Sequence, residues 1–441
     1  MTPEQAQGDF HGTHASPLNW EMKSIGDVFK VVERPLKMEG DKPYRRVTVK
    51  RRYGGIELRD VRRGEEIKVK NQFLVKTGDF LISERQIVHG ACGIVPMSLD
   101  GALVSNEYLV LEPRDGFEVS YFNYLVQLLE YAKLFLLCSQ GVDVEKFLFK
   151  PQDWLKKVVP APPHAEQKKI AAILTAVDDK LDVIARQIEA TNTLKQGLMQ
   201  TLFSRGVGTQ DADGRWVPHA EFKDSELGAI PATWIPTTLG AVCDGALQTG
   251  PFGSQLHAAE YQDDGVPVLM PKDLVGCRAT LATAARIAPA RAEELSKHRL
   301  FAGDLLFSRR GDVARFALID DASEGALCGT GCLKARPSAA HSSAFLAHLL
   351  KLDVVRAWLE QNAVGQTMPN MNTGILSSLP LVVPVDRREQ DEIALILDSI
   401  DSKLQVLAVK LSHFERLKRG LMQKLLTGEW RVSVDASETG A

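Results

Sequence analysis

The chain has 441 residues, a formal net charge of −3 and a charged fraction of 25%. This length allows about two to three domains with sizeable cores, and the composition is that of an ordinary soluble protein. The N-terminus lacks the apolar run of a signal peptide, and the most apolar stretch, 121–138, contains Glu130 and Lys133 and is too short to span a bilayer. We therefore expect a protein of the reducing cytoplasm.

In chain order, globular and helical segments alternate. The expected parts are a disordered N-terminus (1–16), a globular domain (17–163), a long helix (164–205), a polar linker (206–230), a second globular domain (231–386), a second long helix (387–427) and a tail (428–441).

Short β-like runs separated by glycines make up the first globular segment, and a helix follows them. The runs expected to be strands are 45–49, 66–70, 79–83 and 108–112. The helix should cover about 18 residues from Ser120 to Ser139, with a copy from Ser343 to Asn362 in the second segment. Each segment is thus predicted to be a mixed α/β (α+β) domain.

The two long helices are copies of each other. An offset of 223 residues, without a gap, aligns Glu-Gln at 166–167 with 389–390 and Gly-Leu-Met at 197–199 with 420–422. The globular segments open alike too, since Trp20 corresponds to Trp234. The chain is therefore an internal duplication of one globular segment and one helix.

Each long helix carries a narrow apolar stripe, stepping by three and four residues. Its central part, the predicted coiled-coil seam, consists of Val177, Leu181, Ile184, Ile188, Ile400, Leu404, Leu407 and Leu411. In the first helix we expect the stripe to continue through Leu194, Leu198 and Leu202. Such a stripe requires a partner, and the duplicate helix is the obvious one. The alternative is two unrelated core helices.

No catalytic or metal motif is visible. The chain lacks a GxxxxGK[ST] phosphate loop, an HExxH zinc motif and the Asn/Asp-Pro-Pro-aromatic motif of amino-methyltransferases. Of six scattered cysteines only Cys328 and Cys332 are close, near His341, and no second pair completes a zinc site. Buried thiols are the simpler interpretation.

The strongest positive signal is basic. Residues 30–70 hold fourteen Lys or Arg and seven Asp or Glu. An expected hairpin with a Gly-Gly turn could place basic side chains in a DNA groove, whereas the alternative is a charged, solvated edge strand. The candidate DNA-binding residues here are Arg45, Arg46, Thr48, Lys50, Arg51, Arg52 and Tyr53.

Further candidates lie in loops. A Gly-Asp turn precedes an apolar strand at 78–79 and at 303–304, and arginines follow each strand; the Gly-Asp itself is typical of turn chemistry. A Gly-rich loop at 249–256 contains an aromatic residue. The candidates from these segments and from 266–274 are Ser83, Arg85, Gln86, Phe252, Ser254, Gln255, Lys272, Ser308, Arg309 and Arg310.

Together these features resemble the specificity subunit of type I restriction–modification systems. The resemblance covers about 18–430 and is carried by the Trp openings, Pro-Phe-Gly-Ser at 251–254, the run 303–311, Met-Pro-Asn-Met-Asn within 368–381 and both helix signatures. It adds Asn370 and Asn372 to the candidate DNA-binding residues. Residues 141–147 lack the Met-Pro-Asn run, so the first domain departs from the pattern.

The resemblance implies two target-recognition domains and an antiparallel coiled coil that acts as a spacer. It implies no catalysis and no cofactor in this subunit. The partners would be double-stranded DNA, two adenine-methyltransferase (modification) subunits and, in the full complex, restriction/translocase subunits; these partners would bind S-adenosylmethionine, ATP and Mg.

The predicted function is therefore to read a bipartite, asymmetric DNA target, with one half per domain. The helices exceed one DNA turn of about 34 Å, so half-sites about a turn apart could be reached. The alternatives are a coiled-coil scaffold that binds proteins without DNA specificity, or a self-contained DNA methyltransferase.

Overall fold

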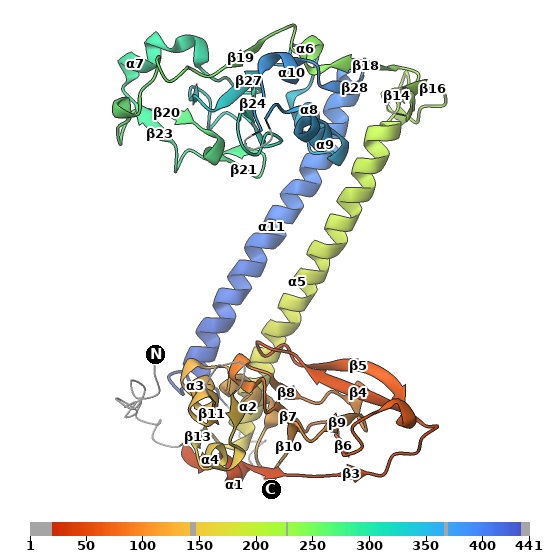
Figure 1. Cartoon of the computed structure of the whole chain (residues 1–441), viewed down its shortest axis with the longest axis vertical. Coiled ribbons are helices and arrows are strands. Elements are labelled where there is room, and N and C mark those ends of the chain that lie inside the picture. The colour runs from red at the N-terminus through yellow and green to blue at the C-terminus, as the bar shows by residue number, and fades with distance from the viewer. Residues whose placement is uncertain (1–19, 142–146, 226–227, 366–368, 434–441) are drawn as a thin grey trace. The chain divides into compact units, whose positions relative to one another are not determined.

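The computed structural model describes residues 20–141, 147–225, 228–365 and 369–433. It divides into two compact units, Met1–Arg186 with Ala408–Ala441, and Gln187–Leu407. Each unit contains one globular domain and parts of two long helices, α5 (His164–Arg205) and α11 (Arg387–Leu426) (Figure 1). Within the described residues, no helix is both long and apolar enough to cross a membrane.

Two sheets form the domain of the first unit. The four-stranded sheet has the order β2 (Phe29–Val31), β10 (Tyr108–Pro113), β7 (Phe80–Ser83), β8 (Cys92–Ile94), and the five-stranded sheet the order β3 (Pro35–Leu36), β6 (Gln72–Leu74), β9 (Leu103–Ser105), β4 (Pro43–Val49), β5 (Ile56–Arg63). The remaining elements are β1 (Glu21–Ser24) paired with β13 (Val158–Ala161), β11 (Ser139–Gln140) paired with β12 (Leu148–Phe149), and α1 (Ile25–Val28), α2 (Val119–Leu125), α3 (Leu129–Leu137) and α4 (Pro151–Leu155).

An aromatic core joins these helices to the four-stranded sheet. Phe122 of α2 meets Phe80 of β7 edge-on, with ring centroids 5.1 Å apart, and also meets Phe29 and Trp154. Aromatic rings bury large areas, and edge-to-face pairs contribute beyond that area. The core therefore holds β7 rigidly at the centre of the domain.

The domain of the second unit repeats this plan with different strands. A six-stranded sheet has the order β19 (Leu247–Thr249), β27 (Cys332–Ala335), β24 (Leu305–Ser308), β25 (Phe316–Leu318), β22 (Arg278–Ala279), β21 (Leu274–Val275), and a three-stranded sheet the order β23 (Ala285–Ile287), β20 (Val266–Leu269), β26 (Leu327–Cys328). The remaining elements are β18 (Trp234–Thr238) paired with β28 (Pro380–Pro384), and α6 (Leu239–Val242), α7 (Pro289–Glu294), α8 (Ser343–Leu349), α9 (Asp353–Asn362) and α10 (Thr373–Ser377). The predicted mixed α/β class, with two domains and two long helices, is confirmed.

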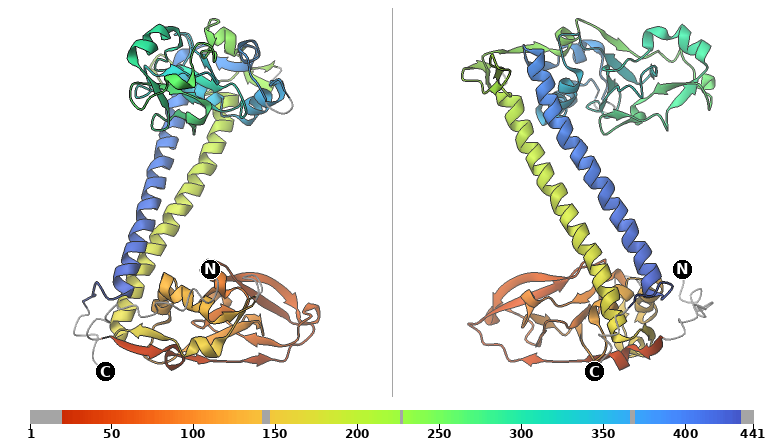
Figure 2. Two further views of the ribbon diagram at one scale, coloured as in Figure 1. Left: turned by 60° about the vertical axis from the view of Figure 1, so that its left-hand side comes forward. Right: turned by 180° about the vertical axis from the view of Figure 1, so that it is seen from behind.

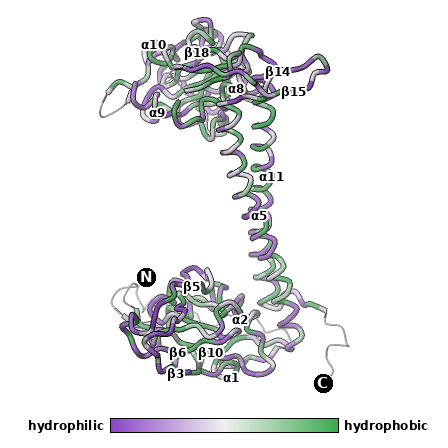
Figure 3. Tube along the Cα trace, turned by 90° about the vertical axis from the view of Figure 1, so that its right-hand side faces the viewer, coloured by the Kyte–Doolittle hydropathy of each residue, from purple (hydrophilic) through white to green (hydrophobic). Residues whose placement is uncertain are grey.

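In each unit the beginning of one long helix packs against the end of the other, so the pair is antiparallel (Figure 2). In the first unit Ile170 and Leu174 share a buried cluster with Leu425. In the second unit Leu202 shares a cluster with Leu397. Apolar and polar residues alternate along both helices, as Figure 3 shows. The packing thus follows the pattern of a coiled coil.

The predicted seam residues lie along this contact. Val177, Ile184 and Leu407 are buried, and Leu181, Ile188, Ile400, Leu404 and Leu411 are partly buried. Leu194 is 49% exposed, so its assignment to the stripe is wrong, and Thr191, 5% exposed, takes that place. Leu194 follows Ile188 by six residues, which at 3.6 residues per turn rotates it well away from the stripe.

The helix expected from Ser120 to Ser139 is in fact two helices, α2 and α3, and its copy is likewise α8 and α9. The break falls at Leu128 and at Leu352, which both have extended backbone (ψ 139° and 138°). One straight helix could not turn the apolar faces of both halves toward the same core. The prediction failed because neither Gly nor Pro marks the break.

The structure differs from two further expectations, at residues 66–70 and in the segment 206–230. Residues 66–70 do not form the expected strand; Ile67 is buried, but Lys70 Nζ donates to Gly64 O and closes a turn instead. The segment 206–230, expected to be a polar linker, instead holds the antiparallel strand pair β14 (Thr209–Gln210) and β15 (Trp216–Val217). A second antiparallel pair, β16 (Phe222–Ser225) and β17 (Gly228–Pro231), follows it. The expected disorder of residues 1–16 concerns residues outside the described ones.

Candidate nucleic-acid interface

The Glu-Gln pair in the first turn of α5 anchors the first domain. Glu166 accepts hydrogen bonds from Trp20 Nε1 at 3.1 Å and from Arg431 Nε at 2.7 Å. Gln167 accepts from Glu118 N at 2.8 Å and donates to Pro162 O at 2.7 Å. The helix signature therefore joins the domain to its helix.

The same joint recurs in the second unit. Glu389 accepts from Trp234 Nε1 at 3.0 Å, lies 2.8 Å from His219 Nε2, and accepts from the backbone of the segment after α5 at Val207 and Gly208. His219 is therefore one residue of the expected linker that is buried against α11.

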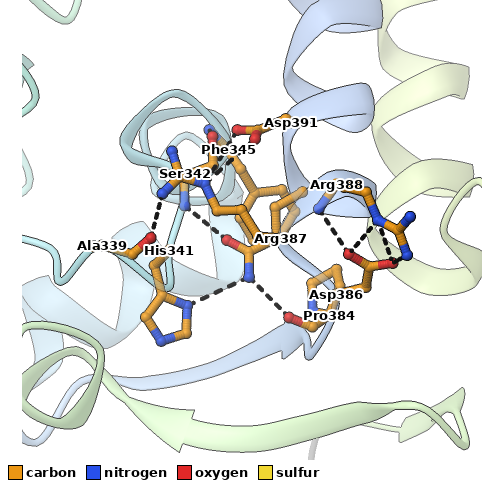
Figure 4. Close-up of polar contacts among 10 residues, drawn as sticks. Ala339, His341, Ser342, Phe345, Pro384, Asp386, Arg387, Arg388 and Asp391 are labelled. Atoms are coloured by element: carbon orange, nitrogen blue, oxygen red, sulfur yellow. Dashed lines mark hydrogen bonds and ion pairs between the residues drawn. The ribbon is translucent and has the colours of Figure 1, made fainter.

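Gln390 completes this joint. Figure 4 shows its two partners, Ser342 and Pro384, together with Arg387. Gln390 accepts from Ser342 N at 2.8 Å and donates to Pro384 O at 2.8 Å, so it connects the start of α8 to the end of β28. Beside it, Arg387 Nη1 donates to Ala339 O at 2.5 Å, and the Arg387 guanidinium also pairs with Asp391. These contacts fix the orientation of the second domain on α11.

One carboxylate on each helix is bound from the opposite helix and from its domain. Asp178 accepts from Tyr124 at 2.9 Å and pairs with Lys418 at 2.6 Å. Asp401 pairs with Lys195 at 2.5 Å and with Lys351 at 3.3 Å. Burial raises the pKa of Asp401, but both lysines outweigh burial and hold this pKa below its usual value.

The β4–β5 turn of the first domain presents two arginines, Arg51 and Arg52, to solvent. Arg52 and Tyr53 both have left-handed backbone, with φ of 58° and 56°. Arg52 N donates to His89 O at 2.7 Å, and Tyr53 N donates to Gly90 O at 2.8 Å. Such strain persists only where neighbours enforce it and gathers at functional sites. The two arginines are thus held on a rigid turn.

Gln86, another predicted residue, contacts this turn by accepting from Arg51 Nε at 2.8 Å. The remaining candidates of the first domain bond within the domain or are partly or wholly buried. Arg45 bonds Ser98 O and Asp100 O, Arg46 pairs with Asp60, Lys50 with Glu57 and Arg85 with Glu107, Thr48 is partly buried and Ser83 is buried.

The Gly-Asp motifs are structural, because the Asp side chain of each one stabilises a turn. Asp79 accepts from Lys76 N at 2.7 Å and pairs with Arg34, and Asp304 accepts from Phe301 N at 2.9 Å and pairs with Arg336. Each buried carboxylate thereby fixes the entry to β7 or β24.

In the second domain, three loops converge at the end of β24. Arg309 Cζ lies 5.9 Å from the centroid of the Phe252 ring, which is 54% exposed. Arg310 forms a β-bridge with Asn370, and Met371 N donates to Arg309 O at 2.8 Å. The structure therefore brings together four of the predicted residues, Phe252, Arg309, Arg310 and Asn370.

The other candidates of this domain have different places. Ser308 is buried and bonds Arg310 O, Asn372 caps α10 by accepting from Ile375 N, Gln255 accepts from Phe252 N, and Ser254 and Lys272 are exposed. Met368 of the Met-Pro-Asn run lies outside the described residues.

Glu84, which was not among the predicted residues, follows β7 as Arg309 follows β24. It is partly buried, and burial first, then the Glu107 carboxylate, raises its pKa. The equivalence of the two positions is visible in the sequence, because aligning the two Gly-Asp turns places Glu84 at the position of Arg309.

The structure offers no metal site among the residues it describes. All six cysteines are free thiols, and burial raises the pKa of Cys328 and Cys332.

Comparison with known proteins gives the family. The sequence model of the type I restriction modification DNA specificity domain matches residues 17–192 and again residues 233–413. Two specificity subunits from Methanocaldococcus jannaschii are similar along nearly their whole length: that of type I restriction enzyme MjaVIII is 27% identical (96% of each chain), and the putative MjaX subunit is 26% identical (94% of this chain, 95% of that one).

A solved structure has the same fold. The S subunit of the type I restriction–modification system from M. genitalium superposes with a TM-score of 0.56 at 14% identity, covering 92% of this chain and 96% of that chain. Because the two matched segments make up more than half of the sequence, the chain belongs to the type I restriction modification DNA specificity family, the non-catalytic DNA-recognition components of these systems.

Proposed function

We propose that this chain reads a bipartite, asymmetric DNA sequence, one half with each domain. The observation that carries the proposal is that each unit presents its own arginine-bearing loops beside the end of an equivalent strand, β7 or β24. Arginine forks suit both guanine edges and phosphates.

The two clusters differ in their side chains, which supports an asymmetric target. The first has Arg51 and Arg52 on a strained turn. The second has Arg309 and Arg310 with the exposed Phe252 ring. Since base recognition depends on the side chains presented, different clusters should select different half-sites.

The coiled coil would set the non-contacted spacer. α5 has 42 residues, which gives a length of about 63 Å at 1.5 Å per residue. The Trp–Glu joints attach each domain to the first turn of a long helix. Changing the helix length should therefore change the spacer and leave both half-sites alone.

Family membership brings DNA binding and assembly with other restriction–modification subunits. We extend this to two adenine-methyltransferase subunits and, in the full complex, restriction/translocase subunits, which would supply S-adenosylmethionine, ATP and Mg. Two exposed apolar residues in the second unit's part of α11, Leu395 and Val406, support a docking surface on this helix. Six free thiols fit work in the reducing cytoplasm.

Arg51→Ala combined with Arg52→Ala tests the proposal. Methylome sequencing of a host that carries the system should show that one half of the methylated motif relaxes or is lost, while the other half persists. A change in both halves, or in neither, would contradict the division of labour.

A further inference from the structure

Two backbone hydrogen bonds hold Glu84, the residue after β7, and so fix the position from which its side chain extends. Glu84 N donates to Glu107 O at 3.0 Å, and Glu84 O accepts from Phe149 N at 3.3 Å. Glu107 directly precedes β10, the strand paired with β7, and Phe149 lies just before α4.

The residue after β24 is held in the same way. Arg309 N donates to Gly331 O at 2.8 Å, and Arg309 O accepts from Met371 N at 2.8 Å. Gly331 directly precedes β27, the strand paired with β24, and Met371 lies just before α10. Glu84 and Arg309 are therefore equivalent positions of the duplicated fold with opposite hydrogen-bonding character.

The Arg309 site has a donor and an acceptor in need of partners. Among the described residues, nothing bonds to the buried Arg309 Nε or to the buried Asn370 Oδ1. Buried polar groups are rarely left unpaired, so such atoms in a binding loop point to a ligand. A phosphate offers acceptors only and could not satisfy Asn370 Oδ1. The edge of a base pair in the major groove offers both kinds of group.

The Glu84 site has the opposite character. Its carboxylate is partly buried, and the charge that acts on it is that of another carboxylate, Glu107. A carboxylate repels phosphates. At a DNA surface it can instead accept from a base amino group, and cytosine N4 is the usual partner of Glu and Asp.

We propose that Glu84 and Arg309 are the equivalent base-reading residues of the two domains: Arg309 donates to a guanine edge in one half-site, and Glu84 accepts from a cytosine amino group in the other. Each half-site then contains a G·C pair at this position. The assignment rests on the proposed function, because it requires each domain to face DNA.

The test uses the full chain assembled with the methyltransferase subunits of its host. Methylation of a duplex library randomised at both half-sites is measured for Arg309→Gln, Arg309→Lys and Glu84→Gln, with Arg356→Gln, an exposed arginine of α9 that pairs with Glu360, and Glu107→Gln as controls. Each of the three variants should relax one G·C position of one half-site, with discrimination there falling on the order of 5- to 100-fold. The other half-site and the salt dependence of binding should not change.

Arg309→Lys keeps the charge but loses the fork, so continued binding with a relaxed position separates loss of reading from loss of folding. A uniform loss of affinity with a salt slope lower by about one would make Arg309 a phosphate contact and overturn its assignment. An unchanged motif for Arg309→Gln and Glu84→Gln, with the wild type still bipartite, would overturn the inference alone. A wild type without a bipartite motif would refute the proposed function itself.

Discussion

The indole nitrogen of Trp234 donates a hydrogen bond to Glu389 Oε2 at 3.0 Å, although 155 residues separate the two in sequence. Both side chains are buried. Trp20 and Glu166 repeat the bond at 3.1 Å in the other unit. In each unit, one buried carboxylate in the first turn of a long helix therefore holds the tryptophan that opens the domain.

Trp234→Phe should destabilise the second unit. The substitution keeps an aromatic ring but removes the donor and leaves a buried carboxylate oxygen short of a partner, which costs about 1–3 kcal/mol. The free energy of unfolding in urea measures this cost. Glu415→Gln, at an exposed position of α11, is the control and should stay within about 0.5 kcal/mol of the wild type. Equal stability of all three proteins would show that the joint contributes nothing.

The seam should tolerate truncation only where it is exposed. Leu407→Ala removes a side chain that is 6% exposed and should cost about 2–5 kcal/mol. Leu417→Ala, at a position 40% exposed on the same helix, should cost far less.

Leu181→Asp and Leu404→Asp should disrupt the helix pair and the assembled complex. If assembly and methylation specificity survived both Asp substitutions, the central role of the seam would be wrong.

Acid should weaken the second domain through His298. Burial first, then Lys297 and Lys334, lowers the pKa of His298 from 6.5 to about 4. The unfolded chain therefore binds this proton more readily, and stability should fall as the pH drops from about 6.5 to about 4 and level off below. Melting temperatures between pH 7.5 and 4 measure the effect, which His298→Gln should reduce. His413→Gln, at an exposed position, should leave the pH profile unchanged.

The repeated helix could be recognised from the sequence because periodicity reports packing directly. The steps of three and four residues gave the seam, and the ungapped copy gave the partner. Leu194 was misassigned because the hydrophobic stripe was followed by residue type, whereas Thr191 occupies the buried position. The break at Leu128 was missed because tertiary packing, not a local breaker, causes it.

The candidate site could be predicted only in part. Arg46 and Lys50 looked like free cations in the sequence, but their carboxylate partners Asp60 and Glu57 come from the opposite strand of the hairpin. Asn372 looked like a donor to DNA and is a helix cap. Such pairings depend on register and turn geometry, which residue types along the chain do not determine.

Longer helices should lengthen the spacer. Four residues inserted between Ala185 and Leu194, with four at the matching place between Ala408 and Leu417, add one turn or about 6 Å to each helix. The spacer should grow by about one to two base pairs, with both half-sites unchanged. Methylome sequencing of the variant host measures this. Altered half-site bases with an unchanged spacer would contradict the role of the coiled coil.

Methylome sequencing of a host that carries the wild-type system tests the central claim most directly. Two domains with different reading loops predict methylated adenines in one motif made of two dissimilar half-sites around a spacer of fixed length and free sequence. A single continuous motif, or a palindromic one, would contradict the account.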